Sequence, residues 1–260
     1  MQTIKTVKTK IKLPVLVAVI LIIAGAGCSK DNSDNGIVIV TANGDITAKL
    51  NEFRQVLGAT LNTQPGAVGG RREINWDAVP DSLLNQPLPN NFFNPAGADA
   101  NLAARQRGLT YETVGQFMVS NNKFTAVNSQ AASEFSSFSG VNAFANVSSN
   151  LWQIDPEVPG EATAATIHGM GIVFSDVDVD NSTFMEFFSE ARSLGKFFVP
   201  KHDNSTKHSF LGVYFKNEKV THVRVGHDGK LADGEKDISG GGTHDLIIMD
   251  DFLYDEPVKK

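Results

Sequence analysis

Turn residues divide the second half of the sequence into short β-prone runs, and this pattern restricts the possible folds more than any other feature. The runs alternate in hydropathy or are rich in β-branched and aromatic residues, as strands are. Regularly spaced short strands predict an all-β, mainly antiparallel fold, a jelly-roll-like β-sandwich. The runs are GMGIVFSDVDV (169–179), STFMEFFS (182–189), SFLGVYF (209–215), KVTHVRVG (219–226) and DLIIMDDFLY (245–254).

The first half is less regular. Residues 46–57, ITAKLNEFRQVL, place apolar residues at three- and four-residue spacing and predict a helix, although so short a run also fits a first strand. Residues 76–97 are rich in proline and asparagine, and they predict a long ordered loop pinned by Leu83, Leu84, Phe92 and Phe93. Three more strands are expected at QFMVS (116–120), KFTAV (123–127) and FSSFSG (135–140), within a single domain over 46–257.

The N-terminus carries an export signal rather than part of the fold. Four lysines precede an apolar segment at 13–24, and the small residues 25–27 lead to Cys28, the only cysteine. Residues 1–27 resemble a bacterial lipoprotein signal peptide, which implies lipidation of Cys28 and a membrane anchor. The alternative is an ordinary secretory signal with an incidental cysteine.

The segment after Cys28 is polar and acidic, and residues 28–45 are predicted to form a flexible tether. The run SKDNSDNG resembles the acidic export signal of surface lipoproteins in Bacteroidota, and a plain spacer is the alternative. In both cases the expected location is the outer membrane, with surface exposure implied by the export signal.

The mature chain is strongly acidic. Removal of residues 1–27 takes away four lysines and no acid, so 23 − 4 leaves 19 Lys and Arg against 29 Asp and Glu, a formal charge of −10. Such a chain repels phosphates, which argues against nucleic-acid binding and favours cations or neutral polymers.

Signatures of common catalytic centres are absent from the sequence. It contains no G-x-S-x-G, H-E-x-x-H or P-loop pattern, and Gly240–Gly242 precedes a strand-like run rather than a helix. His222 and His227 flank one predicted strand, and His202 and His208 lie in one predicted loop. Neither pair has a recognisable metal-ligand spacing, so we expect surface histidines.

Two groups of aspartates are candidate calcium ligands. Asp176, Asp178 and Asp180 alternate along a predicted strand and would offer several carboxylate oxygens on one face, which suits Ca²⁺. The alternative is a solvated strand face that ends in a turn.

The second group is Asp250 and Asp251, which interrupt an otherwise apolar strand, where a buried carboxylate needs a cation or hydrogen-bond donors. This pattern resembles the last strand of jelly-roll carbohydrate-binding modules, which implies a structural calcium there. The alternative partners are Arg71 and Arg72, which would form structural ion pairs with the aspartates.

The run GGRREINWD (69–77) reads as a strand with Arg72, Ile74 and Trp76 on one face. Core packing of Trp76 is one interpretation, and a stacking platform for a sugar ring is the other. The further candidate platforms are Trp152, Tyr111 and Tyr214.

Taken with NNFF, GQFMVS, SFLGV and MDDFLYDEP, the GGRREINWDAVP run resembles a family of uncharacterised secreted bacterial proteins. The resemblance spans most of residues 50–257, and it implies a β-sandwich outside the cytoplasm without implying an activity.

These observations favour a lipid-anchored binding module of the cell surface, for a glycan or another extracellular polymer, with a structural calcium. Two alternatives stay open: a structural or adhesive envelope protein with a protein partner, and a glycoside hydrolase that uses a carboxylate pair. A concave face with exposed aromatic side chains would favour the binding module. An exposed apolar patch would favour the adhesive protein, and a cleft with two facing carboxylates would favour the hydrolase.

Overall fold

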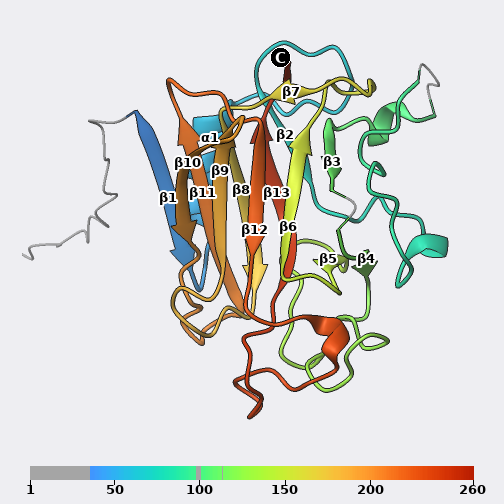
Figure 1. The fold of residues 1–260 in the computed structure, drawn as a ribbon, viewed down its shortest axis with the longest axis vertical. Helices are drawn as coiled ribbons and strands as arrows, with labels where there is room; N and C mark the ends of the chain where they lie inside the picture. Colours follow the sequence, from blue (N-terminus) through green and yellow to red (C-terminus); the bar gives the residue numbers. More distant parts are fainter. Residues whose placement is uncertain (1–35, 98–100, 113) are drawn as a thin grey trace, which may run out of the picture.

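Two antiparallel sheets pack face to face in the computed structural model, which describes residues 36–97, 101–112 and 114–260. Figure 1 looks onto the smaller sheet, with the larger sheet behind it and α1 (Thr47–Leu57) behind that. The all-β sandwich predicted from the sequence is confirmed. Its jelly-roll connectivity stays a prediction. The predicted signal peptide 1–27, Cys28 and tether residues 29–35 lie outside the described residues.

The larger sheet has the strand order β1-β11-β8-β13-β5-β4, and β2 also pairs with β13. Its strands are β1 (Ile37–Asn43), β2 (Arg71–Ile74), β4 (Phe117–Ser120), β5 (Ala143–Asn146), β8 (Gly169–Ser175), β11 (His208–Phe215) and β13 (Ile248–Asp255). The smaller sheet has the order β10-β9-β12-β6-β3. Its strands are β3 (Leu109–Tyr111), β6 (Leu151–Pro156), β9 (Phe184–Ser189), β10 (Arg192–Phe198) and β12 (His222–Gly226).

Shorter elements complete the described chain. A two-stranded ribbon joins β7 (Ala165–Thr166) to β14 (Val258–Lys259) at the upper end of the sandwich in Figure 1. Three 3₁₀ turns, η1 (Asp81–Leu83), η2 (Ala103–Arg105) and η3 (Leu231–Asp233), lie in the connections.

β1 overturns part of the predicted tether. Ile37–Asn43 pairs with residues 209–215 of β11 as an edge strand, and Val40 is buried. The sequence IVIVTAN is β-branched and apolar, so its burial against α1 and β11 outweighs the polar character of the preceding segment. The prediction of a flexible segment is therefore wrong for residues 37–43.

α1 confirms the helical interpretation of residues 46–57 and covers the outer face of the larger sheet. Leu50, Phe53 and Leu57 form its buried stripe. Gly171 of β8 and Gly212 of β11 lie opposite each other in register, and a Cβ on either would come within 2.8 Å of the Phe53 ring. The two glycines therefore create the space that lets the helix pack closely on the sheet. With α1 on one face and the smaller sheet on the other, every residue of β8 is buried.

Trp76 lies at the centre of the core between the two sheets. Its side chain is fully buried and stacks on Phe144 at 4.1 Å between ring centroids, with edge contacts to Phe93 and Phe252. The indole Nε1 donates to the carbonyl of Asp250 at 2.9 Å. The core-packing interpretation of Trp76 is confirmed.

The long loop at 76–97 is ordered where predicted, and Leu84, Phe92 and Phe93 anchor it in the core while Leu83 is partly buried.

The prediction of strands at 123–127 and 135–140 is wrong, because Lys123 and Phe124 adopt positive φ and the chain forms a series of turns there. The Ser120 hydroxyl accepts the Phe124 N–H and fixes that turn.

We expect Trp76→Ala to lower the free energy of unfolding by about 3–5 kcal/mol, because it leaves a cavity among four aromatic rings and removes the donor to the Asp250 carbonyl. Urea denaturation monitored by circular dichroism measures the loss. Leu151→Ala, at a half-exposed position of β6, is the control and should change stability by less than about 1 kcal/mol. A near-neutral Trp76→Ala would contradict the structural role.

Candidate functional site

The chain turns sharply at the end of β8 and carries Asp176 and Asp178 into the interior. Asp176 has a φ of 70° and a fully buried side chain. This turn ends the strand alternation that would place Asp180 on the same face, and the Asp180 side chain is 68% exposed near Lys201. The prediction that Asp176, Asp178 and Asp180 share one ligand-bearing face is therefore wrong for Asp180.

Two other aspartates complete this group, and both come from the loop between η3 and β13. Within the described chain, potential ligand atoms converge to within 4.8 Å of one another in two sets, Asp176–Asp178–His202 and Asp178–Asp237–Asp245. Asp178 belongs to both. Asp237 and Asp245 are almost fully buried. Sequence reasoning missed them because they lie about 60 residues beyond Asp178 and flank a glycine run that has no recognised motif.

The glycine run shapes the loop that presents these two aspartates. Gly242 donates its N–H to the Asp237 carbonyl, and a Cβ at Gly242 would come within 1.8 Å of the Lys236 carbonyl oxygen. The Asp237 carboxylate accepts N–H groups from Ser239 and Leu246, at 2.7 and 2.8 Å. The loop is thereby closed around its own aspartate.

Asp245 reaches across to the loop that follows β8. It accepts the N–H groups of Asp178 and Val179 at 3.1–3.2 Å and the Ser182 hydroxyl at 2.5 Å. Burial raises its pKa to about 6 in spite of these donors. Asp245 therefore ties the two loops together while it faces the Asp178 carboxylate.

A lysine and a histidine contact these carboxylates from the side of Asp176 and Asp178. Lys207 contacts Asp176 Oδ1 at 2.8 Å, and His202 Nε2 lies 2.6 Å from Asp178 Oδ1. His202 Nδ1 accepts the Asn204 N–H at 3.1 Å, so the proton of a neutral ring is on Nε2, which donates to Asp178. His202 acts as a donor to the group rather than as a metal ligand. It is also buried, which corrects its prediction as a surface histidine.

Asp176 and Asp178 each keep one buried oxygen, Oδ2, without a hydrogen-bond partner among the described residues. Burial, together with the charges of Asp178 and Asp237, raises the pKa of Asp176 to about 8 although Lys207 lowers it. Burial and contact with Asp237 also raise the pKa of Asp178. Carboxylates therefore outnumber the cations that neutralise them at this end of the sandwich.

Asp250 and Asp251, the second predicted calcium group, are compensated by the protein itself. Asp250 Oδ2 accepts the N–H groups of Phe138 and Ser139 at 2.6 and 3.1 Å, and the Ser139 hydroxyl donates to Asp251. Arg54 Nη2 lies 3.8 Å from Asp251 Oδ2. These two aspartates belong to neither of the convergent ligand sets in the described chain.

Arg71 and Arg72 do not reach these aspartates, so their predicted ion pairs with Asp250 and Asp251 are wrong. The β2–β13 register places them opposite Asp255 and Tyr254, beyond the bulge that holds the aspartates. Arg71 pairs with Glu73 at 2.7 Å. Arg72 is fully buried and forms a two-point ion pair with Glu256, with both N–O distances 2.7 Å.

Of the four candidate aromatic platforms, three are buried and one is partly exposed. Trp76, Trp152 and Tyr111 are fully buried between the sheets, which excludes all three as stacking surfaces for a sugar. Tyr214 of β11 is partly exposed. It lines a groove of about 220 Å³ together with residues that include His168, Asp255 and Val258. The His168 ring tilts against the Tyr214 ring at 5.9 Å, and Asp255 accepts from His168 Nδ1 at 3.0 Å.

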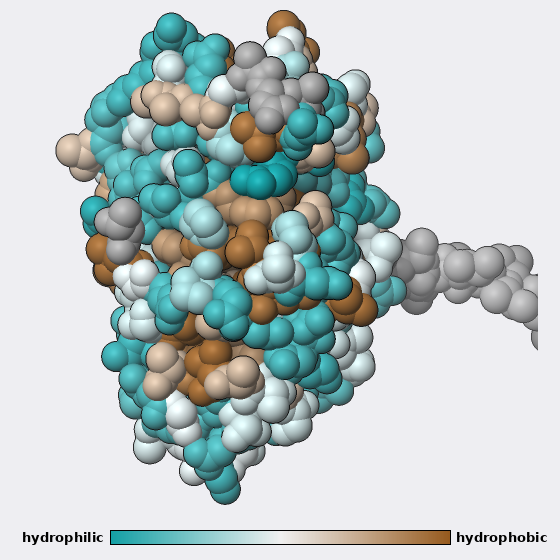
Figure 2. Space-filling view, turned by 90° about the vertical axis from the view of Figure 1, so that its right-hand side faces the viewer, coloured by the Kyte–Doolittle hydropathy of each residue, from teal (hydrophilic) through white to brown (hydrophobic). Residues whose placement is uncertain are grey.

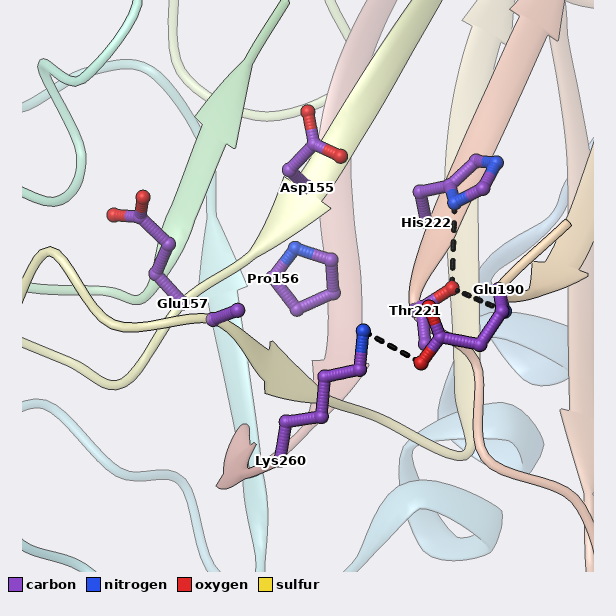
Figure 3. A pocket seen from close by; sticks show the side chains of 8 residues that line it. Asp155, Pro156, Glu157, Glu190, Thr221, His222 and Lys260 are labelled. Carbon is purple, nitrogen blue, oxygen red and sulfur yellow. Dashed lines mark hydrogen bonds and ion pairs between the residues drawn. The ribbon is translucent and has the colours of Figure 1, made fainter.

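A second groove, of about 350 Å³, is lined by residues that include Asp155 of β6, His222 of β12 and Lys260. Figure 3 shows Asp155 and His222 on opposite sides of it, and Lys260 reaching across to Glu190 at 2.5 Å. Burial raises the pKa of Asp155 and lowers that of His222. Sequence reasoning did not single out Asp155, although the alternating run LWQID around it is typical of a half-buried strand.

In Figure 2, hydrophobic side chains reach the face that carries β3, β4, β5 and the long loop in several groups between hydrophilic ones.

Comparisons of the chain with family models, curated proteins and solved structures find no match. Among the described residues, no helix has both the length and the apolar character needed to cross a membrane. The predicted family resemblance stays a prediction.

Glu256→Gln should lower the free energy of unfolding by about 3–5 kcal/mol, because it leaves the Arg72 guanidinium buried without its counter-ion. Glu218→Gln removes the carboxylate from the exposed pair with Arg192 and is the matched control, with an expected change below about 1 kcal/mol. Denaturant unfolding of both variants tests the contrast. Equal effects would show that the buried pair contributes no more than a surface one.

Asp250→Asn should flatten the dependence of stability on pH. Burial and the neighbouring Asp251 raise the pKa of Asp250 from 3.8 to about 8. A carboxylate with a raised pKa in the folded state stabilises the fold fully below about pH 4, and that contribution is lost as the pH rises towards 8. An asparagine keeps an acceptor for the Phe138 N–H and does not titrate. Thermal unfolding at pH 5 and pH 8 in chelator measures the difference, and an unchanged slope would contradict it.

Proposed function

We propose that this chain is a lipid-anchored binding module of the cell envelope, held at the outer membrane through Cys28, that binds an extracellular glycan or another polar polymer. The observation that carries the binding role is the groove beside Tyr214, because Tyr214 is the one predicted aromatic platform that reaches the surface. A partly exposed tyrosine ring can stack on the apolar face of a sugar while neighbouring polar groups bind its hydroxyls.

The lining of this groove combines aromatic rings with polar side chains. The His168 ring contributes a second flat surface next to Tyr214, and it is held there by Asp255, while Glu256 is paired with Arg72. The larger groove adds a separate polar lining with Asp155, Thr221 and His222. A polymer long enough to reach both grooves would contact each of these linings.

The anchor part of the proposal is supported by the signal sequence alone, and the net charge of −10 for the mature chain agrees with a ligand that is neutral or cationic. Cys28→Ala should leave the protein without acyl groups and release it from membranes. Mass spectrometry and fractionation of wild type and variant test this. A variant that still fractionates with the outer membrane, alongside a wild type without acyl mass, would refute the anchor.

A glycan array probed with the purified mature protein tests the binding role. Tyr214→Ala should reduce binding at least tenfold, whereas Tyr214→Phe keeps the ring and should retain most of it. Phe198→Ala, at an exposed aromatic of β10, is the control for loss of an unrelated surface ring. Binding that is unchanged in Tyr214→Ala would remove the groove from the proposal.

A glycoside hydrolase is the second candidate, because Asp155 and Glu190 line one groove and burial raises the pKa of Asp155 as a general acid requires. Release of reducing sugar from a bound glycan, abolished by Asp155→Asn, would favour this candidate over a binding module.

A further inference from the structure

We infer that Asp178, Asp237 and Asp245 form a binding site for one Ca²⁺ ion, which joins the loop after β8 to the loop before β13. This site is separate from the grooves of the proposed function and does not depend on it. It lies at the opposite end of the sandwich from the β7–β14 ribbon, at the lower end in Figure 1.

The spacing of the oxygens suits a calcium ion. Ca²⁺ binds oxygen at 2.3–2.6 Å, so two ligands on opposite sides of the ion lie about 4.6–5.2 Å apart and adjacent ligands lie closer. One carboxylate oxygen from each of Asp178, Asp237 and Asp245 lies within 4.8 Å of the others. The three side chains can therefore contact one ion without a large rearrangement.

A second observation concerns Asp176, which adjoins Asp178 in the other convergent set. The Asp176 side chain is fully buried, and its Oδ2 has no hydrogen-bond partner among the described residues. The potential ligand oxygen of Asp176 lies within 4.8 Å of that of Asp178, whose own Oδ2 is also unpartnered. A buried carboxylate oxygen with no donor is costly, and a bound cation removes that cost.

The charges around the site select a hard cation. Four carboxylates, from Asp176, Asp178, Asp237 and Asp245, gather against one lysine, Lys207, which lies on the Asp176 side. His202 keeps its Nε2 proton for Asp178, so the ligands of the ion itself are oxygens. Oxygen ligands favour Ca²⁺ over Zn²⁺, and ligands on irregular loops suit the variable geometry of Ca²⁺ better than the strict octahedron of Mg²⁺.

The architecture explains why both loops are held in place without the ion. Backbone N–H groups of Asp178 and Val179 already orient Asp245, and those of Ser239 and Leu246 orient Asp237. Both oxygens of each carboxylate accept donors, but Asp237 Oδ1 and Asp245 Oδ1 accept only one N–H group each, which leaves a lone pair on each for a cation. The site is thus organised in advance, which lowers the entropic cost of binding.

Calorimetric titration and thermal unfolding of the purified mature protein test the inference. CaCl₂ should bind with a stoichiometry of one per chain. At a hundredfold excess over its Kd it should raise the melting temperature by about 5–10 °C relative to chelator. MgCl₂ should give a much smaller rise, and ZnCl₂ should not compete for the site.

Asp237→Asn and Asp245→Asn should each abolish the response to calcium, measured for each variant as the difference between its melting temperatures in CaCl₂ and in chelator. Two variants are used because, if one of them fails to fold, the other still tests the site. Asp180→Asn, in the same loop but exposed, should respond as wild type does.

Asp250→Asn tests the alternative calcium position at Asp250 and Asp251, and its response to calcium should equal that of wild type. The inference is overturned if wild type melts at the same temperature in calcium and in chelator and shows no binding heat. It is equally overturned if the response survives in Asp237→Asn and disappears in Asp250→Asn.

Discussion

At Asp250 and Asp251 the strand β13 exchanges one neighbour for another, and the packing of both halves of the chain depends on this point. Before it, Met249 pairs with Phe144 of β5, and after it residues 252–255 pair with β2. The register with β8 shifts over the same two residues. The bulge turns the Asp250 carbonyl towards the Trp76 indole, whose ring stacks on Phe144. One side chain thus fills the junction between β2, β5 and β13.

Buried carboxylates are satisfied in two different ways within this fold, and one group of them is not fully satisfied. Glu256 has a full counter-ion in Arg72, and Asp250 has backbone donors from the loop at Phe138 and Ser139. The group around Asp178 has too few donors and cations for its charge. An acidic chain can keep such residues inside only if each has a partner, which makes the least satisfied group the most informative one.

The strands of the second half were predictable because their alternation reflects direct burial against one core, and α1 was predictable from the spacing of Leu50 and Phe53. β1 was not, since its apolar run follows a polar segment that dominated the interpretation of residues 28–45. The strands expected at 123–127 and 135–140 failed because β-propensity does not reveal a side-chain cap such as Ser120. The burial of Trp76, Trp152 and Tyr111 was open from sequence, because an aromatic residue serves a core and a platform equally well.

The candidate cation site could be found only in part. Asp176 and Asp178 attracted attention through their local spacing, but Asp237 and Asp245 meet them through contacts between loops far apart in sequence, and no periodicity encodes such contacts. The same holds for the partner of Arg72. Its pairing with Glu256 depends on the register between β2 and β13, which the sequence of either strand alone does not specify.

The position of β13 also governs the order in which the chain can fold. This strand lies in the middle of the larger sheet, between β8 and the β5 and β2 pairings, yet it comes from residues 248–255. Arg72 and Glu256, which join its end to β2, are 184 residues apart. Contacts of such long range require closure of most of the chain before they stabilise it, so folding of this sheet is slow by topology. During synthesis, which begins at the N-terminus, the edges of β8 and β2 that pair with β13 must therefore stay unpaired until residues 248–255 have been made.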